Sequence, residues 1–549
     1  MTRVGRDDEL IRPSIEGART GWVSLLASIA GLAALQLWLR PLLPVDETRY
    51  LSVAWEMWSR GDFLVPYLNG APYSHKPPLL FWLIQAVWAV VGVSEFAARL
   101  IPLLLSIVAL WWSAGLARRL WPDRAAVIRP LVPWLLLGGV FWLNFFTLIQ
   151  FDLLLVLAAL LAWRGVLEAV HTPLRGWLLV SLGIGFGILS KGPVILIPVL
   201  PAILFAPWWT ADRAPVSWLA WYLGGLSALL LGAAIALLWA VPAGMAGGDA
   251  YRQAIFWGQS AGRVVSSFAH RNSWWSYVLW LPLMWLPWVL WPQLWKAARR
   301  AGLNDTGVRF CLAVIVPAFV IFSVISGKQG KYLLPLFPLI ALIFARWLGA
   351  LDKDAGVCRL GFIGVFLFVS GLVLVALPWL PTGPDWLSQV QPVWGVVLLV
   401  LGVVLFRLDL KPGTAVRVTS LAIVVWTATL YLALVPRLAA EYDLRPMSQT
   451  LHGLQESGRP LAWLGKYHGQ FHFLGRLQTR IEPLGGSEQV YSWLEANPEG
   501  YLLVNYRTTR PDVPDSVQVQ PYRGGSLVLW PALRLLRDPD RLDALAGSG

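Results

Sequence analysis

Long apolar runs recur along the first 437 residues of the chain and alternate with short polar segments. A helix needs about 20 predominantly apolar residues to cross a hydrocarbon core about 30 Å thick. By this criterion the sequence predicts a polytopic α-helical membrane protein with about thirteen transmembrane helices. We place them at residues 19–40, 98–118, 128–146, 152–168, 176–190, 192–208, 215–241, 274–296, 308–326, 331–349, 358–378, 392–407 and 416–436.

Two polar stretches interrupt this pattern. Residues 41–97 begin polar and then become amphipathic, as in PPLLFWLIQAVWAVVGV. A span in their second half would upset the charge bias of every later loop, so we interpret it as a helix that lies in the membrane interface. Residues 244–273 form a second polar loop. Both loops are expected on the outer face of the membrane.

The composition changes near residue 438. Short strand-like runs such as RPLAWLG, YLLVNYR and SLVLWPALRL follow, separated by glycine, proline and charged residues. Residues 438–549 are therefore predicted to form a small α/β domain of roughly 110 residues, large enough for a core of its own. The transmembrane domain is expected to cover residues 1–437.

The charge pattern sets the expected orientation. The chain has 57% hydrophobic and only 14% charged residues, which excludes an ordinary soluble protein, and its 34 tryptophans suit a membrane interface. Its net charge of +13 comes from short basic clusters between apolar runs, which is the positive-inside pattern and not the footprint of a nucleic-acid partner. These clusters predict a cytoplasmic N-terminus, a first span that stays as an anchor, and an outer C-terminal domain. Examples are Arg118, Arg119, Arg124 and Arg129, and Lys296, Arg299 and Arg300.

The first outer loop contains the strongest candidates for catalytic and phosphate-binding residues. Asp46 and Glu47 directly follow the first span, which places a carboxylate pair at the bilayer surface. Cations near a carboxylate could hold a phosphate while the carboxylate orients or deprotonates an acceptor. A solvated loop in which Asp46 caps a helix is the alternative. The other polar and aromatic candidates in this loop are Arg49, Tyr50, Tyr73, His75 and Lys76.

Further candidates lie at the predicted outer ends of later spans. Asp152 begins a span, where an ionisable residue needs a partner or a cavity, although it could also cap the helix. Lys191 lies in a turn between two apolar runs, where it could contact a phosphate or reach lipid head groups. Arg263 and His270 occupy the loop 244–273. Lys328 and Lys331 are two further candidates, and we expect Lys331 to face the opening of the substrate-binding cavity.

The first loop resembles that of glycosyltransferase family 39, which contains the protein O-mannosyltransferases and the bacterial lipid A aminoarabinose transferases. The aminoarabinose branch has Asp-Glu-x-Arg-Tyr after the first span, then Gly-Asp near a proline, then Tyr-x-x-Lys-Pro. This sequence has Asp46-Glu47-Thr48-Arg49-Tyr50, then Gly61, Asp62 and Pro66, then Tyr73, Lys76 and Pro77. The span count, the outer C-terminal domain and the later motifs extend the resemblance over most of the chain.

The resemblance implies a type C glycosyltransferase fold with catalytic loops at 41–97 and 244–273. It implies transfer of a monosaccharide from polyprenyl (undecaprenyl) phosphate to an envelope acceptor, such as lipid A or another lipopolysaccharide component, at the periplasmic face of a bacterial inner membrane. Asp46 and Asp152, with Glu47, would be catalytic, and His75 and His270 would contact acceptor or sugar. The donor phosphate would be bound by Arg49, Tyr50, Tyr73, Lys76, Arg263, Lys191 and Lys331.

Some positions depart from the family pattern. Certain aminoarabinose transferases have Glu before the Lys-Pro pair and a His three residues before the loop arginine, whereas this chain has His75 and Ser260. The resemblance therefore implies no metal site in this chain, and whether a divalent cation takes part stays open. A protein O-glycosyltransferase is one alternative function. A lipid or sugar transporter is another, but it is expected to show charges at the membrane midplane, whereas here they gather at one face.

Overall fold

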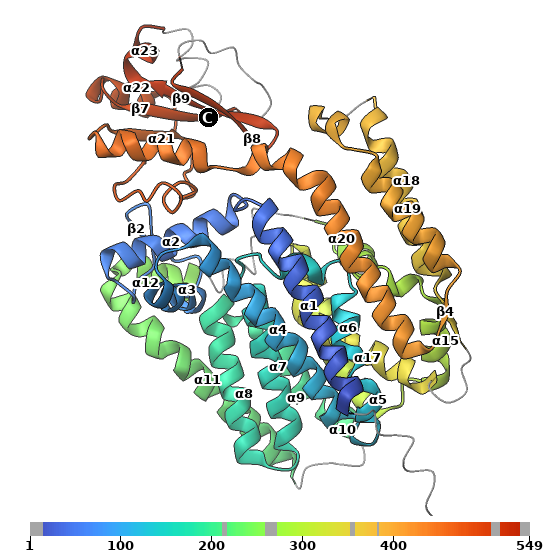
Figure 1. The fold of residues 1–549 in the computed structure, drawn as a ribbon. Coiled ribbons are helices and arrows are strands. Elements are labelled where there is room, and N and C mark those ends of the chain that lie inside the picture. The colour runs from blue at the N-terminus through green and yellow to red at the C-terminus, as the bar shows by residue number, and fades with distance from the viewer. Residues whose placement is uncertain are drawn as a thin grey trace, which may run out of the picture.

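The computed structural model describes residues 15–210, 217–258, 272–351, 357–381, 384–506 and 516–538. A long bundle of helices forms most of the molecule, and a small sheet domain made by the C-terminal part of the chain lies at one end of it (Figure 1). The helix α20 (Pro412–Tyr442) runs the length of the bundle and leads directly into that domain.

Eight segments within the described residues are long and apolar enough to cross a membrane. Each coincides with a predicted span, so the multi-pass membrane class is confirmed, whereas the number thirteen stays a prediction. Their surfaces are apolar, as lipid-facing surfaces must be: in α18 the side chains of Val365, Val369 and Val373 are all exposed. The segments are Gly21–Leu39 in α1 (Ile15–Leu39), α4 (Glu95–Leu120), α8 (Pro173–Lys191), α11 (Trp218–Ala246), α16 (Thr306–Val324), Gly330–Leu351 with η7 (Gly330–Leu336), α17 (Phe337–Leu348) and η8 (Gly349–Leu351), Gly361–Trp379 with α18 (Gly361–Ala376) and η9 (Leu377–Trp379), and Pro412–Glu456 with α20 and α21 (Arg445–Glu456).

Two predicted spans are not single helices. Residues 128–146 fold as α5 (Ala125–Ile128), α6 (Leu131–Leu137) and η2 (Trp142–Phe145), and residues 274–296 as α14 (Ser276–Met284), η6 (Trp288–Leu290) and α15 (Pro292–Ala301). Prolines explain the second break, because Pro287 and Pro292 lack the N–H that a continuing helix needs. In the first, α6 ends at Leu137, and the next residue, Gly138, lies where a Cβ would collide with Trp288 and Ser420, so only glycine fits this contact.

The remaining predicted spans are helical but short or charged. They are α7 (Asp152–Ala169), η3 (Pro193–Ile195) with α9 (Leu196–Leu204) and α10 (Ala206–Thr210), and α19 (Val393–Phe406). A two-stranded pair, β3 (Cys358–Arg359) with β4 (Asp409–Leu410), joins the ends of α18 and α19, and the other short helical turns are η1 (Pro122–Arg124) and η10 (Asp385–Gln389).

The first polar loop is largely helical. It forms α2 (Asp46–Arg60), the hairpin of β1 (Tyr67–Leu68) and β2 (Ala71–Pro72), and α3 (Leu79–Val91). The 13 residues of α3 extend only about 20 Å, too short to cross the core, which fits an interfacial helix. Together with α12 (Asp249–Gln253) and the π-helical turn η5 (Ala254–Gly258), these elements cover the end of the bundle that faces the C-terminal domain (Figure 1).

The C-terminal domain has a five-stranded mixed sheet. Its strands are β5 (Leu461–Leu464), β6 (Glu482–Leu484), β7 (Tyr501–Tyr506), β8 (Gln518–Tyr522) and β9 (Gly525–Pro531), in the order β6-β5-β7-β9-β8. Successive residues of β5 pack on opposite faces: Leu461 and Trp463 belong to a cluster with residues of α21, and Ala462 to one with α22 (Ser487–Ala496) and α23 (Ala532–Leu536). The sheet therefore has a core on each face, as expected of a small α/β domain.

Candidate active site

Asp46 and Glu47 begin α2 but point into different surroundings. The Asp46 side chain is 36% exposed, whereas that of Glu47 is 1% exposed. Both carboxylates lie in the first turn of the helix, where the helix dipole stabilises negative charge. The predicted carboxylate pair at a surface is therefore a single accessible carboxylate, that of Asp46.

Two cations hold the Asp46 carboxylate. The Lys331 Nζ lies 3.0 Å from one carboxylate oxygen and Arg49 contacts the other at 2.5 Å. Gln150 accepts a hydrogen bond from Lys331 at 3.1 Å and donates one to Asp46 at 3.5 Å. Burial tends to raise the pKa of Asp46, but the charges of Lys331 and Arg49 outweigh it, so the pKa lies below its usual value. The carboxylate is therefore ionised at neutral pH.

A second carboxylate–lysine pair lies beside the first. The Lys191 Nζ, at the end of α8, is 2.6 Å from Asp152 at the start of α7, and both side chains are almost fully buried. The same ammonium lies over the ring of Tyr332, 4.7 Å from its centroid. Because Tyr332 follows Lys331 and Asp152 lies two residues after Gln150, both pairs belong to one site, which includes the predicted residues Asp46, Arg49, Asp152, Lys191 and Lys331.

Aromatic residues of the first loop surround Phe151. Its ring lies 4.9 Å from that of Tyr50, and the Lys76 Nζ lies 5.7 Å from its centroid. Tyr73 stacks on His75 at 5.3 Å. Burial raises the pKa of Tyr50 well above its usual value, so its phenol stays protonated. The structure thus brings the predicted residues Tyr50 and Lys76 to Phe151, and places Tyr73, with His75 stacked on it, in the same cluster.

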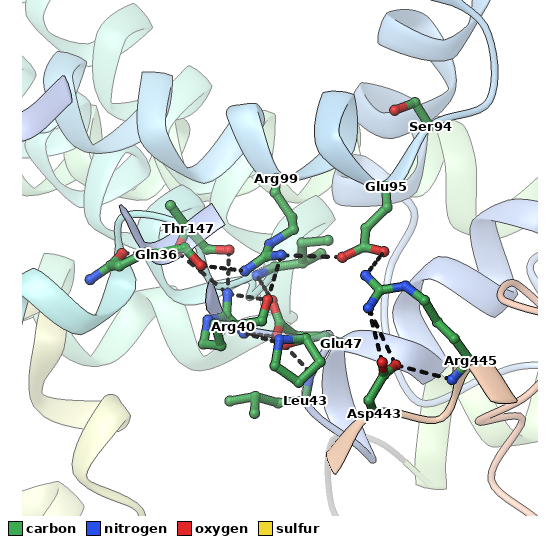
Figure 2. A network of polar contacts seen from close by, with 12 residues as sticks. Gln36, Arg40, Leu43, Glu47, Ser94, Glu95, Arg99, Thr147, Asp443 and Arg445 are labelled. Carbon is green, nitrogen blue, oxygen red and sulfur yellow. Dashed lines mark hydrogen bonds and ion pairs between the residues drawn. The ribbon is translucent and has the colours of Figure 1, made fainter. Parts of the chain in front are cut away.

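Glu47 has a different place from the one expected. Its carboxylate pairs with Arg40 and accepts hydrogen bonds from the backbone N–H groups of Leu43 and Ile149, both at 2.9 Å. Figure 2 shows this buried network, which also includes Arg99. Glu47 therefore has no open oxygen facing the site. Its contacts join the start of α2 to the segment that carries Gln150 and Asp152.

The choice between the two nearby lysines is clear in the structure. Lys331 reaches Asp46, whereas Lys328 is buried and donates to the backbone carbonyls of Asn272 and Ile325. Arg263 and His270 lie outside the described residues. Within the described ranges, no group of three or more His, Cys, Asp or Glu side chains is placed to hold a metal ion.

Sequence reasoning missed three residues of the site: Gln150, Phe151 and Tyr332. All three are next to or near a residue that was singled out, since Gln150 and Phe151 directly precede Asp152 and Tyr332 follows Lys331. The polar Gln150 inside the run NFFTLIQFDLLL was the available signal, because a buried amide in an apolar run needs a partner.

Comparisons with known proteins show which sequences and structures this chain resembles. A family model described as dolichyl-phosphate-mannose-protein mannosyltransferase matches residues 75–239. The undecaprenyl phosphate-alpha-4-amino-4-deoxy-L-arabinose arabinosyl transferase of Edwardsiella ictaluri is 28% identical over 66% of this chain and 66% of its own length. A protein of the same name from Pseudomonas fluorescens strain Pf-5, numbered 1, is 29% identical over 88% of this chain and 93% of its own length. The match thus spans just under two thirds of the Edwardsiella relative and nearly all of the Pseudomonas one.

Solved structures show the fold. The structure of ArnT from Cupriavidus metallidurans bound to undecaprenyl phosphate superposes with a TM-score of 0.68 at 19% identity, over 93% of this chain and 98% of that one. Its apo form gives a TM-score of 0.72 at 18% identity, with the same coverage. The chain therefore has the type C glycosyltransferase fold and resembles the bacterial aminoarabinose transferases of glycosyltransferase family 39.

Proposed function

We propose that this chain is a membrane glycosyltransferase that moves a monosaccharide from undecaprenyl phosphate to an envelope acceptor, lipid A or another lipopolysaccharide component. The observation that carries the proposal is the Asp46 carboxylate held between Lys331 and Arg49, beside the Asp152–Lys191 pair. The names of the relatives and the undecaprenyl phosphate bound to the Cupriavidus protein support the donor class.

The reaction follows from these charges. The bond between the sugar C1 and the phosphate oxygen breaks, the electron pair leaves with undecaprenyl phosphate, and an acceptor oxygen attacks C1 from the opposite side, which inverts the anomeric centre. Lys331, Arg49 and Lys191 stabilise the charge that develops on the phosphate, and the protonated Tyr50 is a further hydrogen-bond donor.

The role of Asp46 depends on the acceptor. A hydroxyl acceptor loses its proton to the Asp46 carboxylate, whereas an acceptor phosphate oxygen has no proton to lose and is only oriented. Because the pKa of Asp46 is lowered, the carboxylate is a weak base and suits orientation better than proton storage.

We also propose that the site and the C-terminal domain face the periplasm and that the N-terminus is cytoplasmic. The basic residues Arg118, Arg119 and Arg124 flank the end of α4 near α5, at the end of the bundle opposite to α2 (Figure 1). Basic loops stay preferentially in the cytoplasm, which supports this orientation in the bacterial inner membrane.

A transfer assay in membranes tests the function. It uses radiolabelled undecaprenyl-phosphate sugars and total envelope acceptors, and compares wild type with Asp46→Asn and Lys76→Ala. The matched controls Asp123→Asn and Lys296→Ala remove exposed charges away from the site. We expect label in lipid A or another glycolipid, a loss of about a hundredfold or more in Asp46→Asn, and unchanged controls.

The same assay separates the alternatives. Label in protein would instead support an O-glycosyltransferase, a class to which the match with the protein mannosyltransferase family model points. No transfer by wild type with any donor would reject the proposed class, and full activity of Asp46→Asn at normal expression would reject the site.

We expect transfer to persist with EDTA, because Lys331 and Arg49 already supply fixed positive charge beside Asp46.

A further inference from the structure

A loop of the C-terminal domain folds back onto α2. The segment from Gly465 to Leu477 leaves β5 and returns to the membrane domain. Gly465 and Gly469, with φ of +90° and +73°, bracket the three residues between them. A Cβ at Gly469 would collide with the Leu68 side chain of the β1–β2 hairpin, so the loop is pressed against the first loop of the membrane domain.

Specific hydrogen bonds fix this loop. The Phe473 N–H donates to the Ser52 hydroxyl at 3.0 Å, and the Trp55 indole donates to the Leu477 carbonyl at 3.0 Å. The Tyr467 hydroxyl lies 2.9 Å from His472 Nδ1 inside the domain. Ser52 lies one helical turn after Arg49 on α2, so the anchor of the loop is next to the candidate site.

Two polar residues of the loop are not used by the fold of the domain. Tyr467 is buried in the domain core, whereas its neighbours Lys466 and His468 are exposed and half-buried. The charges that influence the pKa of the His468 imidazole include those of Arg49 and Asp46, which belong to the membrane domain. Because the loop is docked on α2 and on the β1–β2 hairpin, it presents His468 toward Arg49 and Asp46.

We propose that His468, flanked by Lys466, contacts the acceptor and so makes the C-terminal domain part of the acceptor site. The cations Lys191 and Lys331 extend from the membrane bundle, which under the proposed function would hold the apolar tail of the donor. A second substrate with a large polar head group must approach Asp46 from the water side, which the loop lines. The inference rests on the proposed transferase function.

The chemistry of the imidazole suits this role. Burial and the cations Arg49 and Lys466 lower the pKa of His468, although Asp46 acts in the opposite direction. The ring is therefore neutral at neutral pH, with one nitrogen that donates and one that accepts a hydrogen bond. Such a group can orient an acceptor hydroxyl or phosphate without adding charge of its own.

The experiment compares His468→Ala and His468→Asn with His452→Ala, which removes an exposed histidine of α21 in the same domain. We expect His468→Ala to raise the KM for the acceptor about tenfold. The kcat, the KM for the donor and the melting temperature should stay unchanged, and His468→Asn should restore part of the loss. The control should behave as wild type.

Direct binding of lipid A to the full chain in nanodiscs keeps the two proposals separate. Weaker binding by His468→Ala than by His452→Ala supports the inference even if no donor is turned over, while failed turnover by wild type counts only against the proposed function. Unchanged acceptor KM and lipid A binding would overturn the inference, as would an increase in the donor KM instead. A lower melting temperature with a parallel loss of kcat would assign His468 a structural role.

Discussion

The charge state of Asp46 depends on side chains from separate elements. Burial raises its pKa, and Lys331 is the largest of the influences that lower it. Protonation of Asp46 removes the charge that orients the acceptor, so activity is expected to fall at acid pH as the pH passes through this pKa. Replacing Lys331 by Met removes the main lowering influence. The pKa then rises, and the acid limb of the pH–rate profile should move to higher pH.

The Lys331→Met profile is measured on the residual activity at saturating donor, since we also expect a loss of about a hundredfold at neutral pH. Lys411→Met, which removes a lysine exposed at the start of α20, is the control and should leave the profile in place. An acid limb that does not move in Lys331→Met would mean that Asp46 does not control it.

Local motifs predicted one half of the site better than the other. The residues from Asp46 to Lys76 follow one another closely, so a short pattern identified them. Asp152 and Lys191 were each selected separately, but their 2.6 Å contact joins positions 39 residues apart and depends on how two helices pack. The position of His468 beside Arg49 depends on the docking of a whole domain, which no local pattern encodes.

At the scale of elements, close packing of α7 against α8 sets the Asp152–Lys191 pair. A Cβ at Gly183 would lie 2.7 Å from the Ala158 carbonyl and 2.8 Å from Ala162, so only glycine allows this approach. Gly183→Val should push the helices apart, lower stability by about 1–3 kcal/mol and lower transfer activity as the ion pair loosens. Thermal unfolding in detergent and the transfer assay measure the two effects.

Gly115→Val is the control for this substitution, because a Cβ at Gly115 in α4 meets no atom within 4 Å. It carries the same gain in helix propensity, since valine forms helices better than glycine, without the collision. Equal destabilisation by both variants would contradict the packing argument. So would a Gly183→Val protein with full stability and activity.

Hydropathy predicted where long apolar segments lie better than where a helix breaks. It located the eight long apolar segments, because a run of about twenty apolar residues is typical of a membrane-spanning helix. It failed at residues 128–146 and 274–296, where the apolar run continues but the helix does not. Apolarity reports burial in lipid or protein and says nothing of the direction of the chain, which prolines and close contacts decide.

At the scale of the whole molecule, charged pairs and hydrogen bonds connect the C-terminal domain to the membrane helices. Arg445 of α21 pairs with Glu95 of α4 at 2.8 Å, and Glu95 in turn pairs with Arg99 at 3.1 Å (Figure 2). Arg99 donates to the Arg40 carbonyl at 2.9 Å, and Arg40 holds Glu47. The network therefore leads from the C-terminal domain to Glu47 at the start of α2.

A second connection is the reciprocal pair between Asn69 and the backbone of Ile481. The Asn69 amide donates to the Ile481 carbonyl at 2.8 Å and accepts from the Ile481 N–H at 2.9 Å. Asn69→Ala removes both bonds, each worth about 1 kcal/mol, and places alanine at a φ of 54°, where asparagine is better tolerated. Residues 467–481, which include most of the loop described above and extend to Ile481, should then separate from the membrane domain more often.

Amide hydrogen exchange of the full chain measures this opening. We expect exchange in residues 467–481 to become about tenfold faster or more in Asn69→Ala, and exchange in β7 and β9 to stay as in wild type, because the sheet keeps its own core. Asn304→Ala, at an exposed turn before α16, should change neither region. If 467–481 exchanges as in wild type, the contact with Asn69 does not hold the domain. If β7 and β9 also exchange faster, the domain depends on docking for its own stability, and His468 could not be presented by a preformed loop.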